Sequence, residues 1–146
     1  YVKNGGTLLV QYNRSNFLSS LKSDLGPYPF KITRDRVTDE NAEVRIIKPE
    51  HKLFNQPNKI QSTDFKGWIQ ERGLYFAGDY DSKYETLLSM NDNGESPLEG
   101  SLIYTNFGKG CYIYTGLSFF RELPAGVPGA YRLFVNLISA GYPQHD

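Results

Sequence analysis

The stretch of sequence that decides the fold is residues 110–139, GCYIYTGLSFFRELPAGVPGAYRLFVNLIS. It runs from a glycine turn through an apolar strand to the polar corner Phe120-Arg121-Glu122, and then through a loop rich in glycine and proline into a helix. α/β folds usually place their sites where a strand ends in such a corner and feeds a helix. This corner lacks the side chains that would make a nucleophilic enzyme, and the functional interpretation depends on that deficit.

The segments on either side of the turn predict a hairpin and a terminal helix. Residues 108–110, GKG, should connect antiparallel strands over 101–107 and 111–117, because glycine supplies the positive φ angles that such a turn needs. A helix is expected from about 129 to 139, with an apolar face toward the core. The residues expected to be buried on it are Phe134, Leu137 and Ile138, while Arg132 and Asn136 share its other face.

The first strand is predicted at residues 7–12, TLLVQY, a continuous apolar run between glycines and a polar turn. This pattern is typical of a strand buried on both faces, and therefore of a central, parallel strand covered by helices. Residues 1–6 resemble the end of a helix with a glycine cap, which indicates a fragment of a longer protein, truncated at its N-terminus. A short helix is expected over 13–21.

The middle of the chain predicts peripheral strands and one more helix. Residues 30–33 and 42–47 alternate apolar with polar side chains, as strands with one exposed face do. A helix should begin with Ser62 or Thr63 as its N-cap and end at Gly73, and a further strand is expected over 84–90. The predicted fold class is α/β, a single domain over residues 1–146 with a mixed sheet, helices on both faces and an antiparallel hairpin at one edge.

Composition narrows the classes of partner. The chain has 16 Lys and Arg residues against 16 Asp and Glu residues, so no long-range field favours a polyanion and we expect no nucleic-acid partner. Its one cysteine, Cys111, excludes an internal disulfide and a multi-cysteine metal site. No run approaches the roughly 20 apolar residues of a membrane span, and no signal peptide is present.

Two parts of the chain resemble known families. Residues 1–10 and 108–117 resemble the class I glutamine amidotransferase-like superfamily, including its ThuA-like branch. More narrowly, residues 57–60, 64–76 and 119–133 are similar to the C-terminal region of large bacterial LmbE/PIG-L-like proteins, which are related to N-acetylglucosaminyl deacetylases. The resemblance implies a flavodoxin-like three-layer sandwich, and as its partner a zinc deacetylase domain in the missing N-terminal portion of the same protein. It also implies a bacterial source, with the cell compartment left open.

The chain departs from the amidotransferase pattern at both catalytic positions. Where the superfamily places a cysteine on the elbow after the central strand, residues 10–14 read VQYNR, and where it places His-x-Glu, only Glu122 matches. Nucleophile and base are both lost, so the resemblance implies a catalytically silent domain. The deacetylase ligands are also missing, because His51 and His145 lie apart without a set of convergent carboxylates. We therefore expect no metal and no cofactor.

The strongest functional candidates are polar and aromatic side chains from the middle and the C-terminal corner. Planar arginines beside aromatic rings could bind a sugar, a carboxylate or another domain, whereas the alternative is that the charges form ion pairs that hold loops. The candidate residues are Asn58, Asp64, Trp68, Glu71, Arg72, Arg121, Glu122, Tyr131 and Arg132.

Two functions from different classes remain open. The first is a non-catalytic accessory domain of an LmbE/PIG-L-like deacetylase that contributes to domain packing or to carbohydrate binding. The second is an independent hydrolase or sugar-binding domain in which Glu122 works with Asp64 or Glu71, which requires paired carboxylates about 5–10 Å apart in one cleft. A separate aromatic group beside Asp79 and Asp81 is a further candidate for a carbohydrate site. Its members are Tyr75, Phe76, Tyr80 and Tyr84.

Overall fold

The computed structural model describes residues 1–14 and 25–142, and its centre is a four-stranded mixed sheet. The strand order is β1-β10-β9-β7, formed by Thr7–Gln11, Gly110–Thr115, Leu102–Phe107 and Glu85–Thr86. β1 is parallel to β10, whereas the pairs β10–β9 and β9–β7 are antiparallel. The mixed α/β class and the predicted hairpin are confirmed, and Gly108 in the turn has φ 61°.

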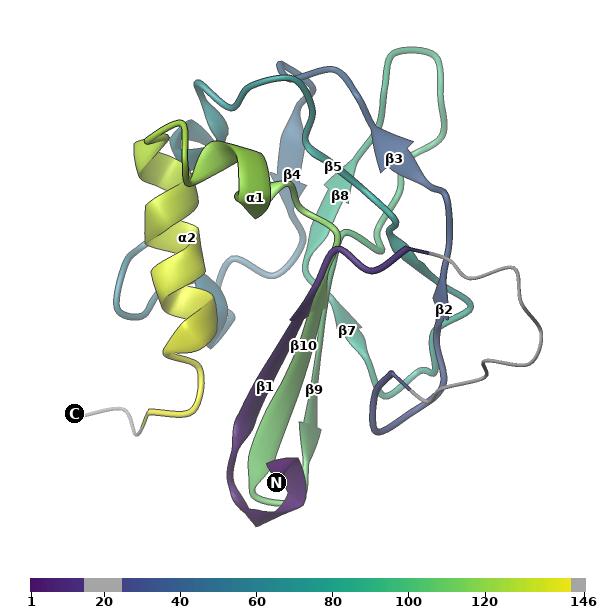
Figure 1. Ribbon diagram of the computed structural model, residues 1–146, viewed down its shortest axis with the longest axis vertical. Helices are drawn as coiled ribbons and strands as arrows, with labels where there is room; N and C mark the ends of the chain where they lie inside the picture. Colours follow the sequence, from purple (N-terminus) through teal and green to yellow (C-terminus); the bar gives the residue numbers. More distant parts are fainter. Residues whose placement is uncertain (15–24, 143–146) are drawn as a thin grey trace.

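The helices pack on one face of this sheet (Figure 1). α1 (Phe119–Glu122) and α2 (Pro128–Ile138) follow β10, and the 3₁₀ helices η2 (Lys52–Phe54) and η3 (Ser62–Phe65) contact α2. The larger core lies between these helices and the sheet, with buried side chains contributed by both layers. Among them are Leu102, Tyr104, Ile113, Leu133 and Leu137.

The opposite face of the sheet is covered by extended segments. Ile103, Tyr112 and Tyr114 of the sheet form a second, aromatic-rich core with Ala77 and Tyr84. The covering segments include β2 (Lys31–Ile32) and β6 (Ala77–Gly78), which pair antiparallel. Over residues 1–14 and 25–142 no helix covers this face, and the helix predicted over 13–21 falls mainly outside the described residues.

Two further strand pairs lie beside the main sheet. β3 (Arg36–Val37) pairs with β5 (Gly73–Leu74), and β4 (Val44–Ile46) pairs with β8 (Leu88–Met90). The strand predicted over 84–90 is therefore two strands, because β7 pairs with β9 in the main sheet while β8 pairs with β4.

The predicted helix from Ser62 or Thr63 to Gly73 is wrong beyond its first turn. Only η3 is helical, with Gln61 as its N-cap, and the chain then turns through Gly67 at φ 76° and Gln70 at φ 67°. Left-handed backbone cannot continue a helix. Residues 71–74 are instead drawn into pairing, since the Arg72 N–H donates to the Val37 carbonyl and Gly73–Leu74 forms β5.

β1 is parallel, as predicted, but it is not central among the described strands. It pairs with β10 alone, and the Leu8 side chain on it is 41% exposed. The helical turn expected before it is confirmed, because η1 (Val2–Asn4) ends on Gly5 at φ 114°. The antiparallel hairpin occupies the other side of β10, which leaves β1 at the end of the described sheet.

The predicted C-terminal helix is confirmed, although the face it buries differs. α2 buries Leu133, Asn136 and Leu137, whereas Ile138 is 50% exposed and Phe134 is partly covered. The apolar pattern predicted a buried face shifted by one residue towards the C-terminus. The reason is that the polar Asn136 occupies a buried position, whereas the pattern assigned it to the exposed face.

Candidate functional site

Seven of the nine candidate residues fall into two neighbouring groups rather than one cleft, and Trp68 and Tyr131 lie beside them. Asn58, Asp64 and Arg132 meet beside α2, while Glu71, Arg72, Arg121 and Glu122 surround the start of α1. Trp68 is buried and donates its indole N–H to the Asp64 carbonyl at 3.0 Å. Tyr131 lies on the exposed side of α2, and its hydroxyl donates to the Leu123 carbonyl at 2.5 Å.

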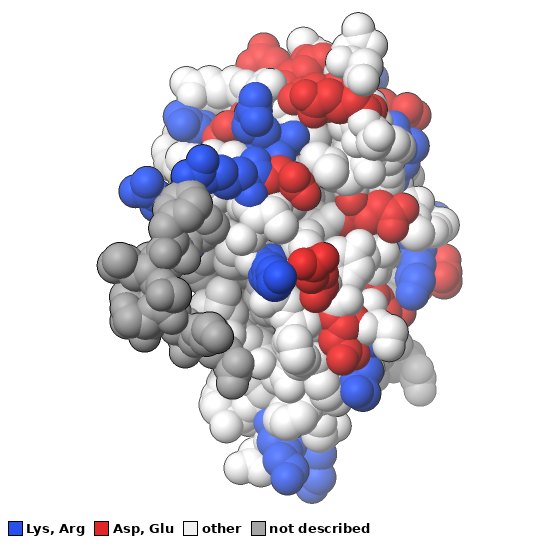
Figure 2. Space-filling view, turned by 90° about the vertical axis from the view of Figure 1, so that its right-hand side faces the viewer, with Lys and Arg blue, Asp and Glu red and all other residues white. Residues whose placement is uncertain are grey.

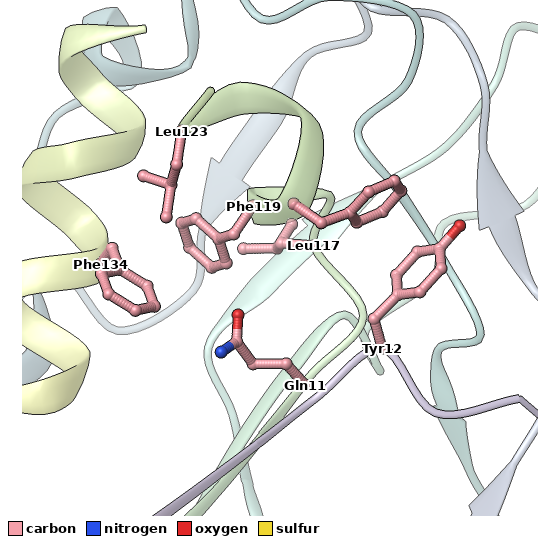
Figure 3. A pocket seen from close by; sticks show the side chains of 7 residues that line it. Gln11, Tyr12, Leu117, Phe119, Leu123 and Phe134 are labelled. Carbon is pink, nitrogen blue, oxygen red and sulfur yellow. The ribbon is translucent and has the colours of Figure 1, made fainter. Parts of the chain in front are cut away.

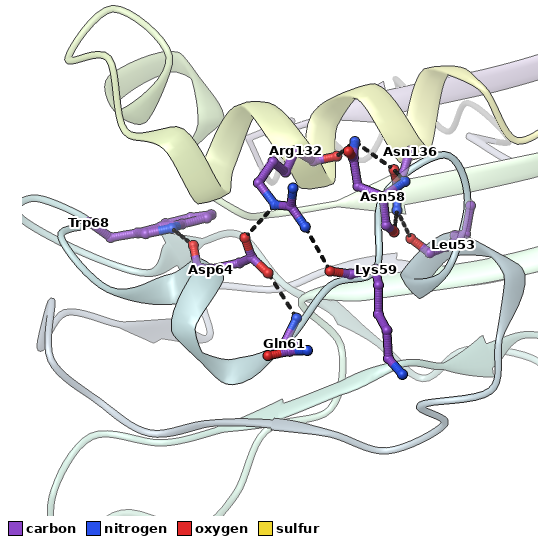
Figure 4. A network of polar contacts seen from close by, with 8 residues as sticks. All are labelled: Leu53, Asn58, Lys59, Gln61, Asp64, Trp68, Arg132 and Asn136. Atoms are coloured by element: carbon purple, nitrogen blue, oxygen red, sulfur yellow. Dashed lines mark hydrogen bonds and ion pairs between the residues drawn. The ribbon is translucent and has the colours of Figure 1, made fainter.

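The group beside α2 is a closed network (Figure 4). The Arg132 guanidinium donates to Asp64 Oδ1 and to the Lys59 carbonyl, both at 2.8 Å. The second oxygen of Asp64 accepts the Gln61 N–H at 2.8 Å, at the start of η3. Both Asp64 oxygens are therefore bound within the protein, which leaves this carboxylate poorly placed to act as a base.

Asn136 is the buried polar residue of the same network. Its amide nitrogen donates to the carbonyls of Leu53 and Asn58 at 2.9 and 2.7 Å, and its oxygen accepts the Asn58 N–H at 2.9 Å. A buried side-chain amide with these partners satisfies backbone groups that the loop cannot pair itself. Asn58 is thus a docking residue that fastens its loop to α2.

Arg72 occupies the centre of the second group. Only 5% of the residue is exposed, and its guanidinium donates to the Ala42 carbonyl through Nε at 3.1 Å and Nη2 at 2.7 Å, and through Nη1 to the Phe65 carbonyl. Burial lowers the pKa of Arg72, and the charges of Asp39 and Glu122 oppose that shift. The guanidinium stays charged at any physiological pH. Arg72 therefore binds backbone and offers little to a ligand.

Glu122 is the most deeply buried acid of the corner. The Ile69 N–H donates to Oε1, and Oε2 lies 3.4 Å from the Ser118 hydroxyl, whose nearer acceptor is the Glu71 carbonyl at 3.0 Å. Burial raises the pKa of Glu122, although the Ile69 N–H opposes the shift. The side chain is fully buried, so its proton has no direct route to a solvent-exposed substrate.

Arg121 is the more exposed member of an ion pair with Glu71, with side chains 38% and 14% exposed, respectively. Arg121 Nε lies 3.2 Å from Glu71 Oε1, and the Tyr12 hydroxyl donates to the same oxygen at 3.5 Å. The Arg121 guanidinium also lies over the Phe120 ring, 4.9 Å from its centroid. Arg121 and the 48% exposed Phe120 are therefore the members of this group that a solute can reach most readily.

Two of the rings next to this pair, Tyr12 and Phe120, were not predicted as site residues, whereas Tyr75 was assigned to the aromatic group beside Asp79. Tyr12 packs against Tyr75 and Phe120 at centroid distances of 5.3 and 4.5 Å. The backbone is in the left-handed region at Tyr12 (φ 46°) and Tyr75 (φ 60°), as it is at Gln70. Such strained backbone in residues other than glycine often occurs at functional positions. We call Tyr12, Tyr75, Phe120, Glu71 and Arg121 the aromatic corner. The one sequence signal for it is that Tyr12 directly follows β1, at the elbow.

A groove of about 450 Å³ opens beside the aromatic corner, between β1, α1 and α2 (Figure 3). Its wall is mainly apolar, with the Gln11 amide pointing into it. The lining residues are Gln11, Tyr12, Leu117, Phe119, Phe120, Leu123 and Phe134. None of these side chains is a carboxylate, an imidazole or a thiol, so the groove can bind apolar groups but supplies no general acid other than the Tyr12 phenol.

His51 and Cys111 lie outside the corner and are both engaged. His51 Nδ1 accepts the Leu53 N–H at 3.2 Å, and Nε2 faces Glu85 Oε2 at 3.3 Å. With both nitrogens bound, the ring has no atom left to accept a proton from a nucleophile. Burial lowers the pKa of His51, although Glu85 opposes the shift. Cys111 is buried, with its Sγ 3.6 Å from Thr7 Oγ1.

The carbohydrate group predicted beside Asp79 is formed only in part, because Asp79 and Tyr80 line a hollow of about 380 Å³. Phe76 and Tyr84 are core residues, and burial raises the pKa of Tyr84 to about 12, so the predicted carbohydrate group around Asp79 loses two of its rings. Asp79 instead pairs with Lys31 at 3.1 Å. Residues 1–14 and 25–142 hold no group of three or more His, Cys, Asp or Glu side chains suited to a metal, and His145 lies outside that range.

The comparisons with known proteins bear on the fold alone. No protein-family model matches the chain, and no curated protein matches it. A solved structure does. The cytoplasmic protein STM3548 from Salmonella typhimurium is 18% identical, with a TM-score of 0.58 over 96% of this chain and 56% of its own. The chain therefore spans just over half the length of this solved neighbour, and the likeness supports the mixed α/β architecture.

Surface charge and hydropathy add two general findings. Figure 2 shows acidic and basic side chains interspersed over the face it draws. Within the described part of the chain, no helix has the length and apolar character that crossing a bilayer requires.

Glu122 predicts a distinct pH dependence of stability. Because its folded pKa lies above the ordinary value of 4.5, its stabilising contribution is complete below that pH and is lost as pH rises through the folded pKa. Relative to a Glu122→Gln variant, which keeps an acceptor for the Ile69 N–H, the wild-type chain should lose stability as the pH rises above 4.5. Urea denaturation of both proteins over a range of pH above 4.5 measures the difference between their free energies of unfolding. The contributions of the other carboxylates are the same in both proteins and cancel in this difference. A difference that is constant, or that grows in favour of wild type, would contradict the assignment.

Proposed function

We propose that this chain is a non-catalytic accessory domain of an LmbE/PIG-L-like sugar deacetylase protein, with a flavodoxin-like, class I glutamine amidotransferase-like frame of the ThuA-like kind. One observation carries the proposal: the three candidate carboxylates, Asp64, Glu71 and Glu122, are all bound within the protein. Asp64 is held by Arg132 and Gln61, Glu71 by Arg121, and Glu122 by Ile69 and Ser118. Groups bound in this way act as scaffolding.

The hydrolase alternative needs two carboxylates that face one cleft with different protonation states. Glu122 has the raised pKa of a general acid, but it is fully buried beneath the loop that carries Ile69. Its suggested partners, Asp64 and Glu71, each face an arginine at 2.8 and 3.2 Å. The groove of Figure 3 contains none of the three. These contacts favour the accessory role over hydrolysis.

Among residues 12–14, the described residues that follow β1, only Tyr12 has a hydroxyl that could replace the missing nucleophile. Burial together with the nearby Glu71 raises the pKa of its phenol. At neutral pH the phenol is protonated and therefore a weak nucleophile. The Tyr12 hydroxyl donates a hydrogen bond to Glu71. Because the Glu71 carboxylate is paired with Arg121, it is a poor acceptor for the phenol proton.

The proposal predicts that the purified chain has no glutaminase, esterase or N-acetylglucosamine deacetylase activity above background. Each assay should include the Glu122→Gln variant and, as a matched control on the ion pair with Arg121, Glu71→Gln. The expected result is the same background rate for all three proteins. A turnover that Glu122→Gln abolishes by about a thousandfold, in a variant that remains folded by circular dichroism, would overturn the proposal in favour of a hydrolase.

A second candidate function is carbohydrate binding at the aromatic corner. Phe120 is 48% exposed and stands beside Tyr12, and the ion pair of Glu71 with Arg121 lies within reach of the same surface. Sugars stack their C–H faces on such rings, while carboxylates and guanidinium groups bind their hydroxyls. This arrangement would let the accessory domain present an amino sugar to the deacetylase.

Titration with glucosamine and with N-acetylglucosamine, followed by NMR, tests the carbohydrate site. We expect shifts confined to the aromatic corner, with millimolar affinity, and a loss of at least about tenfold in Phe120→Ala. Tyr131→Ala is the control, because Tyr131 is similarly exposed but lies on α2 outside the corner. Absence of shifts, or equal losses in both variants, would contradict the carbohydrate assignment and leave the accessory role in place.

A further inference from the structure

β1 has one edge with which no strand of the described residues pairs. The Gly6 carbonyl accepts the Cys111 N–H at 3.2 Å, and the Tyr12 N–H donates to the Thr115 carbonyl at 2.9 Å. Because peptide groups alternate between the two edges of a strand, the even-numbered residues of this run bond to β10 and the odd-numbered ones point the other way. Thr7, Leu9 and Gln11 therefore direct their N–H and C=O groups away from β10, where no strand of the described chain pairs with them.

This edge lacks the features that keep exposed strands apart. Natural edge strands carry charged residues, prolines or bulges that block pairing. Residues 5–12, GGTLLVQY, contain neither a charge nor a proline, and the ladder with β10 is regular over all five residues of β1. An unprotected edge of this kind is complementary to another strand.

Apolar side chains and hollows flank the edge on both faces of the sheet. On the α2 face, Leu9, Ile138 and Tyr142 line a hollow of about 350 Å³. On the other face, Leu8 and Tyr112 line one of about 280 Å³. The side chains of an added strand alternate between the two faces, so such a strand would fill both hollows.

We propose that a β-strand of the same protein, from polypeptide outside residues 1–146, lies parallel to β1 and extends the sheet at this edge. The inference rests on the proposed accessory role, because it names where the rest of the protein attaches. Two observations favour a parallel strand of the same protein. β1 is apolar toward both faces and already belongs to a parallel pair, which is typical of the interior of a parallel sheet.

The second observation is the length of the solved neighbour. It matches 96% of this chain with 56% of its own length, which leaves 44% (100 minus 56) of that protein outside the match. Parallel neighbours need a crossover of a dozen or more residues, which an additional segment of this size can supply. A second copy of this chain, related by two-fold symmetry, would instead pair antiparallel through β1.

Amide hydrogen exchange tests the proposal with controls inside the same strand. The 146-residue chain and the complete gene product that contains it are compared by NMR. In the isolated chain the amides of Leu9 and Gln11 should exchange rapidly, while those of Leu8, Val10 and Tyr12, which face β10, are protected. In the complete protein we expect Leu9 and Gln11 to slow by roughly 100-fold or more, with little change at the other three.

A substitution supplies an independent readout. Leu8→Lys replaces a side chain that is exposed in the isolated chain, so the midpoint of its thermal unfolding should stay within about 2 °C, whereas the complete protein should lose at least about 4 °C. Ile47→Lys is the matched control, because Ile47 is 38% exposed on β4's side of the molecule and should leave both proteins unchanged.

Three outcomes would overturn the proposal. A gene product of only these 146 residues, or equal exchange of Leu9 and Gln11 in both proteins, would exclude an added strand. Protection in the isolated chain that rises with concentration would assign the edge to a second copy instead. Enzymatic activity of the 146-residue chain would end the accessory proposal without altering these amide patterns, so the two failures are distinguishable.

Discussion

The buried guanidinium of Arg72 is the interaction on which the surrounding structure depends. It binds the Ala42 and Phe65 carbonyls, while its own backbone joins Val37 and Ser118. The side chain and backbone of this one residue thereby join segments near residues 37–42 and 118 to the loop that follows η3. Burying a charge is costly unless its donors are bound, and here the carbonyls and the nearby Glu122 supply that compensation. The loop over residues 66–72 then turns through Gly67 and Gln70 in left-handed conformations that no helix could accommodate.

The same interaction explains why the corner resembles an active site without the contacts of one. Glu122 accepts the Ile69 N–H from the loop that Arg72 anchors, and Glu71 reaches Arg121 at the surface. Charges at the carboxyl end of a strand commonly signal chemistry, but they also supply the hydrogen bonds that irregular loops cannot make for themselves. In this chain the buried members of the corner hold backbone. What remains accessible is Arg121 with the ring of Phe120, next to the half-buried Tyr12 and Glu71.

Local signals predicted the elements that depend on local chemistry. The hairpin over Gly108 and the helix α2 follow from glycine turns, an apolar period and a proline at the helix start. The helix expected after Ser62 failed because tertiary contacts of Arg72 outweigh helix propensity, and the buried Asn136 misled the assignment of the α2 face. The charges of the corner were identified from the sequence. Tyr12 was not, since its strain and its contact with Phe120 arise only when the elbow and α1 meet.

The central claim is that Glu71, Arg72, Arg121 and Glu122 stabilise the fold rather than bind a ligand. The free energies of unfolding of Arg72→Met and Arg121→Met test this claim most directly. Loss of the buried guanidinium leaves two carbonyls and Glu122 without compensation, so Arg72→Met should destabilise the chain by about 3–5 kcal/mol. Arg121→Met removes a partly exposed pair and should cost less than about 1 kcal/mol. Urea denaturation measures both values. An Arg72→Met protein as stable as wild type would contradict the account, because the Arg72 side chain would then make no net contribution to the stability of the fold.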